Sequence, residues 1–188
     1  AGAVDAAEFS DQELALMCAS HMGEDIHVKT ARSMLDKLGL SGADLECGSH
    51  FPLDKITQRK MIKDGKNAEP FHNNCSGKHV GMLALAKHLG LGIKGYIQKD
   101  HPVQKEIFNL VHELTGLENI PTETDGCSAP TPFMSLETIA RLFQKLAAGE
   151  TPELSRVFDA MWIPTPRVGA LKVHRCCAVD GLSDATRK

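Results

Sequence analysis

The chain is organised around one stretch, which reads PFHNNCSGKH at residues 70–79 and VGMLALAKHLG at residues 80–90. Residues 72–79 carry two imidazoles, two amides, a thiol, a hydroxyl and an amine, whereas the following segment is apolar and ends at a glycine. This pattern predicts a reactive turn attached to the start of a buried helix. Free N–H groups and a partial positive charge at a helix start stabilise a thiolate or an oxyanion, and they make a nearby lysine easier to deprotonate.

Bulk composition indicates an ordinary globular protein of one or two domains, with 188 residues and 42% hydrophobic content. A net charge of −3 gives no basic footprint for nucleic acid. No run approaches the roughly 18 apolar residues of a membrane helix, and residues 1–5 lack the features of a signal peptide. Because the first residue is Ala rather than Met, we expect a fragment or a processed chain.

Six cysteines suggest disulfides at first sight, but the chain is long and rich in ordinary core residues, and no export signal is seen. We therefore expect reduced thiols and a cytoplasmic location. The cysteines are Cys18, Cys47, Cys75, Cys127, Cys176 and Cys177.

Periodicity and capping signals predict many helices and few strands. A capping box at residues 10–13 opens a short helix, and further helices are expected at 27–38, 54–63, 80–89, 102–114, 135–148 and 155–161. Strand candidates are 14–19, 94–98 and 170–174, and residues 121–132 are expected to form a polar loop bounded by prolines.

The pair Gly77-Lys78 invites comparison with a phosphate-binding loop, but the required glycine and hydroxyl positions hold His72 and His79. A serine–lysine site is the next possibility, because a neutral lysine can take the proton of a serine hydroxyl. Ser20 is the candidate nucleophile, since it ends an apolar run beside His21. Its structural alternative is that Ser20 caps a turn, as serine often does.

Two of the six cysteines, Cys75 and Cys127, lie in polar loops near Lys78 and Asp125. Thiolates combined with nitrogen or carboxylate groups suit zinc. A zinc finger is not supported, because no paired C-x-x-C motifs occur, and the C-x-x-H spacing of residues 47–50 is a weak signal.

Four segments resemble, in order, the rhizobial-type L-asparaginases, which are the class 3 enzymes of the asparaginase II family. They are CASHMGE at 18–24 followed by His27-Val28, CGSHFP at 47–52, HNNCSGKH at 72–79 and DGCSAP at 125–130. The resemblance covers about residues 1 to 160, and the third segment is long and compositionally unusual.

The resemblance implies a mixed α/β fold of the α+β class, similar to serine β-lactamases and glutaminases, with helices packed around a mixed sheet. It implies hydrolysis of L-asparagine to L-aspartate and ammonia through Ser/Lys catalysis, with Ser20 as nucleophile. Cys75, Lys78 and Cys127 match a zinc site in which a lysine amine is a ligand. Asp125 matches an acidic residue expected to fix the lysine or a water. The implied partner is a small-molecule substrate, without nucleic acid or membrane, and a homodimer is the expected assembly.

The chain departs from the family at both ends. No serine is followed three positions later by lysine, so the first Ser-x-x-Lys tandem of the family is missing. Residues 1–161 are expected to form the central part of a single asparaginase-like domain, and 162–188 a divergent tail of frameshifted or misassembled origin. Lys172 is a candidate for the missing base.

Three functions therefore stay open. The first is an asparagine amidohydrolase that uses Ser20. The second is a catalytically incomplete remnant of that family that binds metal. The third is a hydrolase that depends on Cys75, with His72 or His79 as its base.

Overall fold

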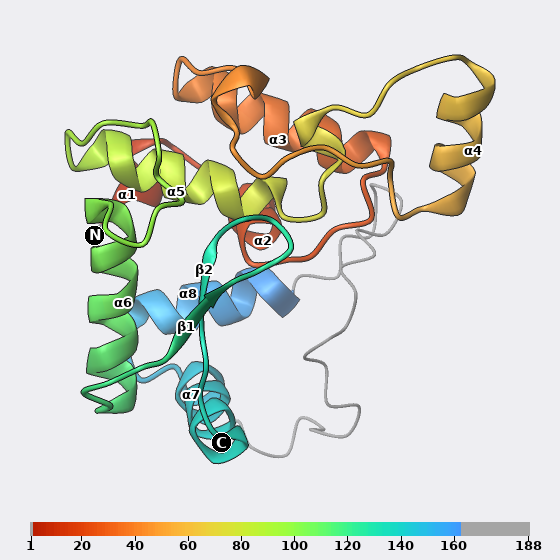
Figure 1. The fold of residues 1–188 in the computed structure, drawn as a ribbon. Helices are drawn as coiled ribbons and strands as arrows, with labels where there is room; N and C mark the ends of the chain where they lie inside the picture. Colours follow the sequence, from red (N-terminus) through yellow and green to blue (C-terminus); the bar gives the residue numbers. More distant parts are fainter. Residues whose placement is uncertain (1, 163–188) are drawn as a thin grey trace.

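The computed structural model describes residues 2–162, and within them helices dominate around one small sheet (Figure 1). The predicted α+β class is confirmed. The predicted strand at 170–174, Lys172, and all of the expected tail except Trp162 lie outside the described residues. In chain order the elements are α1 (Ala3–Ala6), α2 (Asp11–Met17), α3 (Asp25–Lys37), the 3-10 helix η1 (Gly42–Asp44), α4 (Lys55–Lys63), η2 (Pro70–His72), α5 (Ser76–His88), α6 (Pro102–Thr115), β1 (Thr122–Thr124), β2 (Pro130–Pro132), α7 (Leu136–Ala148) and α8 (Pro152–Trp162).

Helix α5 is the buried centre of the fold, as its apolar sequence predicts, and it begins at Ser76 rather than Val80. Val80, Leu83 and Ala86 on this helix are fully buried. In Figure 1, α5 lies in one layer with α1 and α3, above α2. Gly77 permits the close contact with α2, because a Cβ atom on it would lie 2.3 Å from the Leu16 carbonyl oxygen. The reactive turn and the core therefore share one helix.

The predicted strand at 14–19 is wrong, because residues 14–17 belong to α2 and Cys18 is its C-cap. The predicted capping box is present: Ser10 Oγ accepts from the Glu13 N–H, and Glu13 accepts from the Ser10 N–H at 2.7 Å. Glu13 also forms a 2.7 Å ion pair with Lys37 of α3. The cap commits the following apolar run to a helix whose Leu14 and Leu16 side chains are buried.

The sheet of the described residues is an antiparallel hairpin, β1 with β2, inside the region predicted to be a loop. Thr122 pairs with Pro132 and Thr124 with Pro130. Short proline-containing strands carry little of the usual strand signal, since proline cannot donate to the ladder. The predicted strand at 94–98 is also wrong, because residues 94–97 form turns. The hairpin loop holds residues 125–129, and in Figure 1 it extends over α2.

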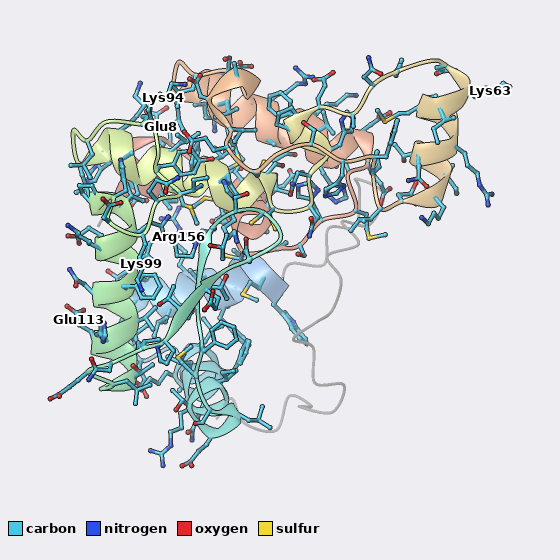
Figure 2. The ribbon with its side chains drawn as sticks, in the orientation of Figure 1. Glu8, Lys63, Lys94, Lys99, Glu113 and Arg156 are labelled. Atoms are coloured by element: carbon cyan, nitrogen blue, oxygen red, sulfur yellow. The ribbon has the colours of Figure 1, made fainter. Side chains whose placement is uncertain are left out.

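Two amphipathic helices contribute little to the core. Helix α4 stands apart from the other helices in Figure 1, and Met61 is its buried residue, whereas Lys63 lies at its outer end (Figure 2). Helix α7 packs against α6 and α8 but buries none of its side chains fully. In the described part of the chain, no helix combines the length and apolar character needed to cross a membrane.

Candidate functional site

The turn before α5 is shaped by the side chain of Asn73. Its Nδ2 donates to the Cys47 carbonyl oxygen at 2.7 Å, and its Oδ1 accepts from the Cys75 N–H at 2.9 Å. Cys75 consequently occupies the N-cap position of α5. The amides of the HNNCSGKH motif thus have a structural role: they connect this turn to the loop at residues 45–54.

Ser20 lies in an exposed position after α2, next to the same turn. Asn74 Nδ2 donates to Ser20 Oγ at 3.0 Å, and the His21 N–H donates to the Asn74 carbonyl oxygen at 3.1 Å. Beneath them, His21 Nε2 lies 2.8 Å from the buried Ser76 Oγ. The Ser20 segment is therefore attached to the turn at three points. We call Ser20, Asn74 and His50, which contacts Asn74, the serine side of the site.

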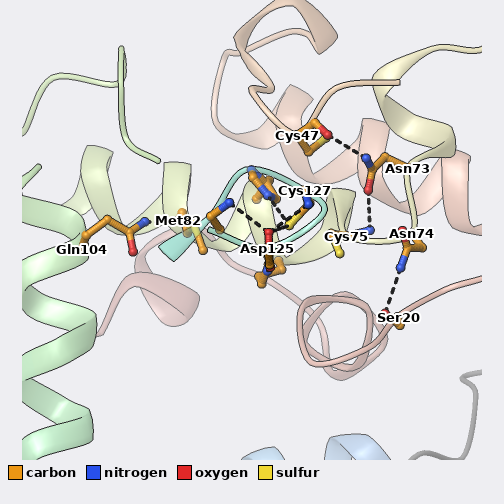
Figure 3. A network of polar contacts seen from close by, with 12 residues as sticks. Ser20, Cys47, Asn73, Asn74, Cys75, Met82, Gln104, Asp125 and Cys127 are labelled. Atoms are coloured by element: carbon orange, nitrogen blue, oxygen red, sulfur yellow. Dashed lines mark hydrogen bonds and ion pairs between the residues drawn. The ribbon is translucent and has the colours of Figure 1, made fainter. Parts of the chain in front are cut away.

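On the other side of Cys75, four polar side chains converge from α5 and the hairpin loop (Figure 3). Lys78 Nζ lies 2.9 Å from Asp125 Oδ2, and Cys127 Sγ lies 3.0 Å from Asp125 Oδ1. Cys127 also forms hydrogen bonds with the Cys75 thiol and with the Lys78 amine. We call Cys75, Lys78, Asp125 and Cys127 the sulfur–lysine cluster; in the view of Figure 3, Cys75 lies between the Cys127 loop and the Asn74–Ser20 pair.

Asp125 organises the hairpin loop as well as the cluster. Its Oδ1 accepts from the backbone N–H groups of Cys127 at 2.9 Å and Ala129 at 3.0 Å. Burial opposes its ionisation, but hydrogen bonds from Cys127, Lys78 and Ala129 outweigh burial and hold the pKa of this carboxyl below its usual range. Asp125 is therefore an anion that positions two cluster members.

A histidine and a tyrosine that sequence reasoning did not assign to the cluster support it from below. His79 Nε2 lies 3.2 Å from Cys127 Sγ, and His79 Nδ1 lies 2.7 Å from the hydroxyl of Tyr96. Both rings are fully buried. Since both nitrogens of His79 face these partners, this ring is not placed to act as the base for Cys75. The single signal for His79 is its position one turn after Cys75.

Two buried imidazoles lie beneath Ser20. His21 and His27 stack with ring centroids 5.1 Å apart. Burial lowers the pKa of His21 to about 3, with further lowering by the neighbouring His27, and burial lowers the pKa of His27 to about 4. Both rings are therefore neutral near pH 7 and act as packing and hydrogen-bonding groups.

Comparison with known families decides the identity. A sequence model of the L-asparaginase II family matches residues 1–170. The chain belongs to the L-asparaginase II family. No curated protein matches the chain. Membership assigns it to the asparaginases, which are amidohydrolases that act on a small-molecule substrate.

The asparaginase fold brings the four predicted cluster residues together and places Ser20 on the other side of the same turn. Within residues 2–162, no lysine side chain hydrogen-bonds to Ser20, whose hydroxyl instead meets the Asn74 amide. The cluster residues were predicted from the resemblance. Asn74 and Tyr96 were missed, and His50 had only a weak signal, because their roles depend on contacts between distant segments.

The two thiols of the sulfur–lysine cluster differ in how readily they ionise. The hydrogen bond from Cys127 lowers the pKa of the Cys75 thiol to about 7, and Lys78 contributes to that shift. The hydrogen bond with Cys75 and burial raise the pKa of Cys127 to about 12. Cys75 is thus the thiol of the pair that more readily becomes a thiolate.

One prediction about the charge of Lys78 is wrong. A helix start was expected to make this amine easier to deprotonate. Burial does favour the neutral amine, but hydrogen bonds with Asp125 and Cys127 outweigh it and raise the pKa of Lys78. The full negative charge of a carboxylate at 2.9 Å has a larger effect on the lysine pKa than the partial positive charge of the helix terminus.

Proposed function

We propose that the chain hydrolyses L-asparagine to L-aspartate and ammonia with Ser20 as the nucleophile. Family membership supports amide hydrolysis. The observation that carries the assignment to Ser20 is its exposed hydroxyl, held by Asn74 on the turn that also bears Cys75 and leads into the helix of Lys78. Neither histidine proposed as a base for Cys75 hydrogen-bonds to its thiol within residues 2–162, which disfavours the thiol-dependent alternative.

The chemistry divides into two acyl-transfer steps. Ser20 Oγ attacks the side-chain amide carbon of asparagine, the C–N bond breaks, and ammonia leaves with the proton that the hydroxyl gives up. Water then hydrolyses the resulting aspartyl ester, releases aspartate and restores the hydroxyl. Asn74 Nδ2, at 3.0 Å from Oγ, is a donor toward the negative charge that develops on this oxygen.

We propose zinc as the ligand of the sulfur–lysine cluster. Within residues 2–162 no three His, Cys, Asp or Glu side chains are arranged to hold a metal ion, so the two thiols need Lys78 as a third donor. The donor set fits, because Cys127 lies within hydrogen-bonding reach of both Cys75 and Lys78, and a metal that binds these groups would displace the protons of the thiols and the amine. Bound zinc would supply positive charge for orienting substrate, while Asp125 would hold the amine and the hairpin loop in place.

The zinc assignment is tested by elemental analysis of the purified protein. Cys127→Ala should lose bound zinc, because it removes one of two sulfur donors. Cys18→Ala is the matched control, since Cys18 is an exposed free thiol outside the cluster, and it should keep zinc at the level of the unmodified protein. Undiminished zinc in Cys127→Ala contradicts the proposed ligand set.

The nucleophile is tested by comparing asparagine hydrolysis by Ser20→Ala and Cys75→Ser. Loss of the attacking oxygen should abolish turnover in Ser20→Ala, whereas Cys75→Ser should keep a measurable rate. Ser49→Ala is the matched control, because Ser49 is another exposed loop serine. Full activity in Ser20→Ala would contradict the serine mechanism.

A second function has one observation in its favour. In the part of the chain that the structure describes, Ser20 has no basic side chain as a hydrogen-bond partner, which favours a metal-binding remnant without catalysis. Zinc binding by a chain that shows no asparagine hydrolysis would establish this alternative in place of the first.

A further inference from the structure

Helix α4 combines a strong positive charge with an isolated position. Residues 54–66 hold five basic and two acidic side chains, a net charge of +3, whereas the whole chain has a net charge of −3 with histidine neutral. The rest of the chain therefore has a net charge of −6, so the excess of cations is concentrated in this one segment. Figure 1 shows α4 apart from the other helices, and Figure 2 shows Lys63 at its outer end.

The cations of α4 are not neutralised by the fold. Within residues 2–162, Arg59 and Lys63 form no ion pair, whereas Arg141 of α7 pairs with Glu137. Arg59 and Lys63 are four residues apart on one helix, so their like charges lie side by side and repel each other. An anionic partner would remove this repulsion.

Two isoleucines accompany the cations on the exposed side of the helix. Ile56 is 78% exposed and Ile62 is 59% exposed, whereas Met61 is buried. Because an α-helix turns by about 100° per residue, Arg59 and Lys63 lie opposite Met61, and the isoleucines flank them. The face that α4 presents to solvent therefore mixes large apolar side chains with unpaired cations.

A membrane surface with anionic phospholipids fits this combination of side chains. The negative headgroups attract lysine and arginine, and apolar side chains of an interfacial helix enter the boundary between headgroups and acyl chains. A purely ionic partner, such as a nucleic acid backbone, would leave the isoleucines in water. A lipid surface also needs no groove of its own to receive a convex helix, because its headgroups rearrange around the side chains.

We propose that α4 docks the protein on anionic phospholipid surfaces, with Arg59 and Lys63 at the headgroups and Ile56 and Ile62 in the interface. The nine-residue helix is about 14 Å long, far shorter than the hydrocarbon core, so it lies on the membrane and does not cross it. The inference goes beyond the proposed function and does not depend on it, because it concerns a different surface of the molecule.

The test is co-sedimentation of the protein with lipid vesicles. Phosphatidylcholine vesicles that contain about one-third phosphatidylserine should bind the protein, and vesicles of phosphatidylcholine alone should not. Salt at about 0.5 M should release the bound protein, because it screens the cations of α4. The double variant Arg59→Glu and Lys63→Glu should bind roughly 10-fold more weakly or worse, since it reverses two charges at the contact.

The matched control is the double variant Lys99→Glu and Lys105→Glu. Both lysines are exposed, and the net charge changes by the same amount as in the α4 variant. Lys99 and Lys63 lie on opposite sides of the molecule in Figure 2. Charges this far from the contact are screened, so the control should bind within about 3-fold of the unmodified protein.

A second pair of variants tests the apolar part of the contact. Ile56→Ser should weaken vesicle binding roughly 5-fold, because it removes an apolar side chain from the interface. Leu136→Ser is the matched control, since Leu136 is 82% exposed but belongs to α7, and its binding should be unchanged. Thermal unfolding of every variant, measured in parallel, separates loss of binding from loss of the fold.

Three outcomes overturn the inference. The first is equal binding to vesicles with and without phosphatidylserine, or binding to neither. The second is an equal loss of binding in the α4 double variant and in the Lys99 and Lys105 control, which would assign the effect to net charge. The third is unchanged binding by Ile56→Ser, which would show a purely ionic contact of the kind that an acidic protein or a nucleic acid makes.

Discussion

The sulfur–lysine cluster and the serine side share one turn, yet their polar groups are satisfied in different ways. Lys78 is held by Asp125, and Cys127 is surrounded by Cys75, Asp125 and His79. Ser20 is exposed, and its described partner is the neutral Asn74 amide. The first region is a network of charged and polar groups that stabilise one another. The second region presents a hydroxyl that Asn74 orients and that stays accessible at the surface. Stability and reactivity therefore lie on opposite sides of Cys75.

The largest expected effect comes from a substitution in α5, because both regions depend on the packing of this helix. Gly77→Ala places a methyl group 2.3 Å from the Leu16 carbonyl oxygen, which is backbone and cannot move cheaply. The free energy of unfolding should fall by about 3 kcal/mol or more. Gly92→Ala is the control, since a Cβ atom there meets nothing within 4 Å. Urea unfolding of both variants measures the difference, and equal stability would contradict the tight α2–α5 contact.

Acidification should weaken the serine side first, because it rests on His21 and His27. Their pKa values in the folded protein, about 3 and about 4, lie below the unfolded value of 6.5. The unfolded state therefore binds more protons, and stability is lost as the pH falls from 6.5 toward 4. Between pH 6.5 and 5, His27 alone should cost roughly 2 kcal/mol. Urea unfolding across this range measures the loss, which His27→Leu should reduce; an identical pH slope in that variant would sink the assignment.

Asp125→Ala should sharpen the contrast from the side of the cluster. It leaves the backbone N–H groups of Cys127 and Ala129 and the Lys78 amine without their carboxylate. Because the cluster is partly open to solvent, the free energy of unfolding should fall by only about 1–2 kcal/mol. Chemical denaturation checks the value. The matched control is Asp100→Ala, because Asp100 lies at an exposed turn. Asp159→Ala would not serve, because Asp159 takes part in interactions.

The smallest expected effect is that of Ser20→Ala on stability. Ser20 is exposed and makes one side-chain hydrogen bond with Asn74, so the free energy of unfolding should change by less than about 0.5 kcal/mol. Thermal and urea unfolding measure it. A loss as large as that of Asp125→Ala would show that Ser20 serves the fold rather than the chemistry.

The helices of this fold were predictable because their signals are local. Periodicity and a cap gave 27–38 and 135–148, which the structure places at Asp25–Lys37 and Leu136–Ala148. The strands were not predictable in the same way. Thr122–Thr124 and Pro130–Pro132 are short and contain prolines, so they carry little of the usual strand signal, although the Asp125 side chain closes the loop between them by accepting from the Ala129 N–H.

The site was predictable where its residues lie in one motif. Cys75 and Lys78 are three residues apart at a helix start, and the structure joins them to Cys127. The contacts of His50 with Asn74 and of Tyr96 with His79 join distant segments, and no spacing in the sequence predicts them. The same distance dependence explains the error over Lys78, whose charge is decided by Asp125, 47 residues away.

The most direct test of the account is detection of the covalent intermediate. The protein is mixed with L-asparagine, quenched in acid and digested, and its peptides are analysed by mass spectrometry. With Ser20 as the nucleophile, an aspartyl group should be added to the peptide that carries Ser20 and should be absent in Ser20→Ala. An aspartyl group on Cys75, or continued asparagine hydrolysis by Ser20→Ala, would contradict it.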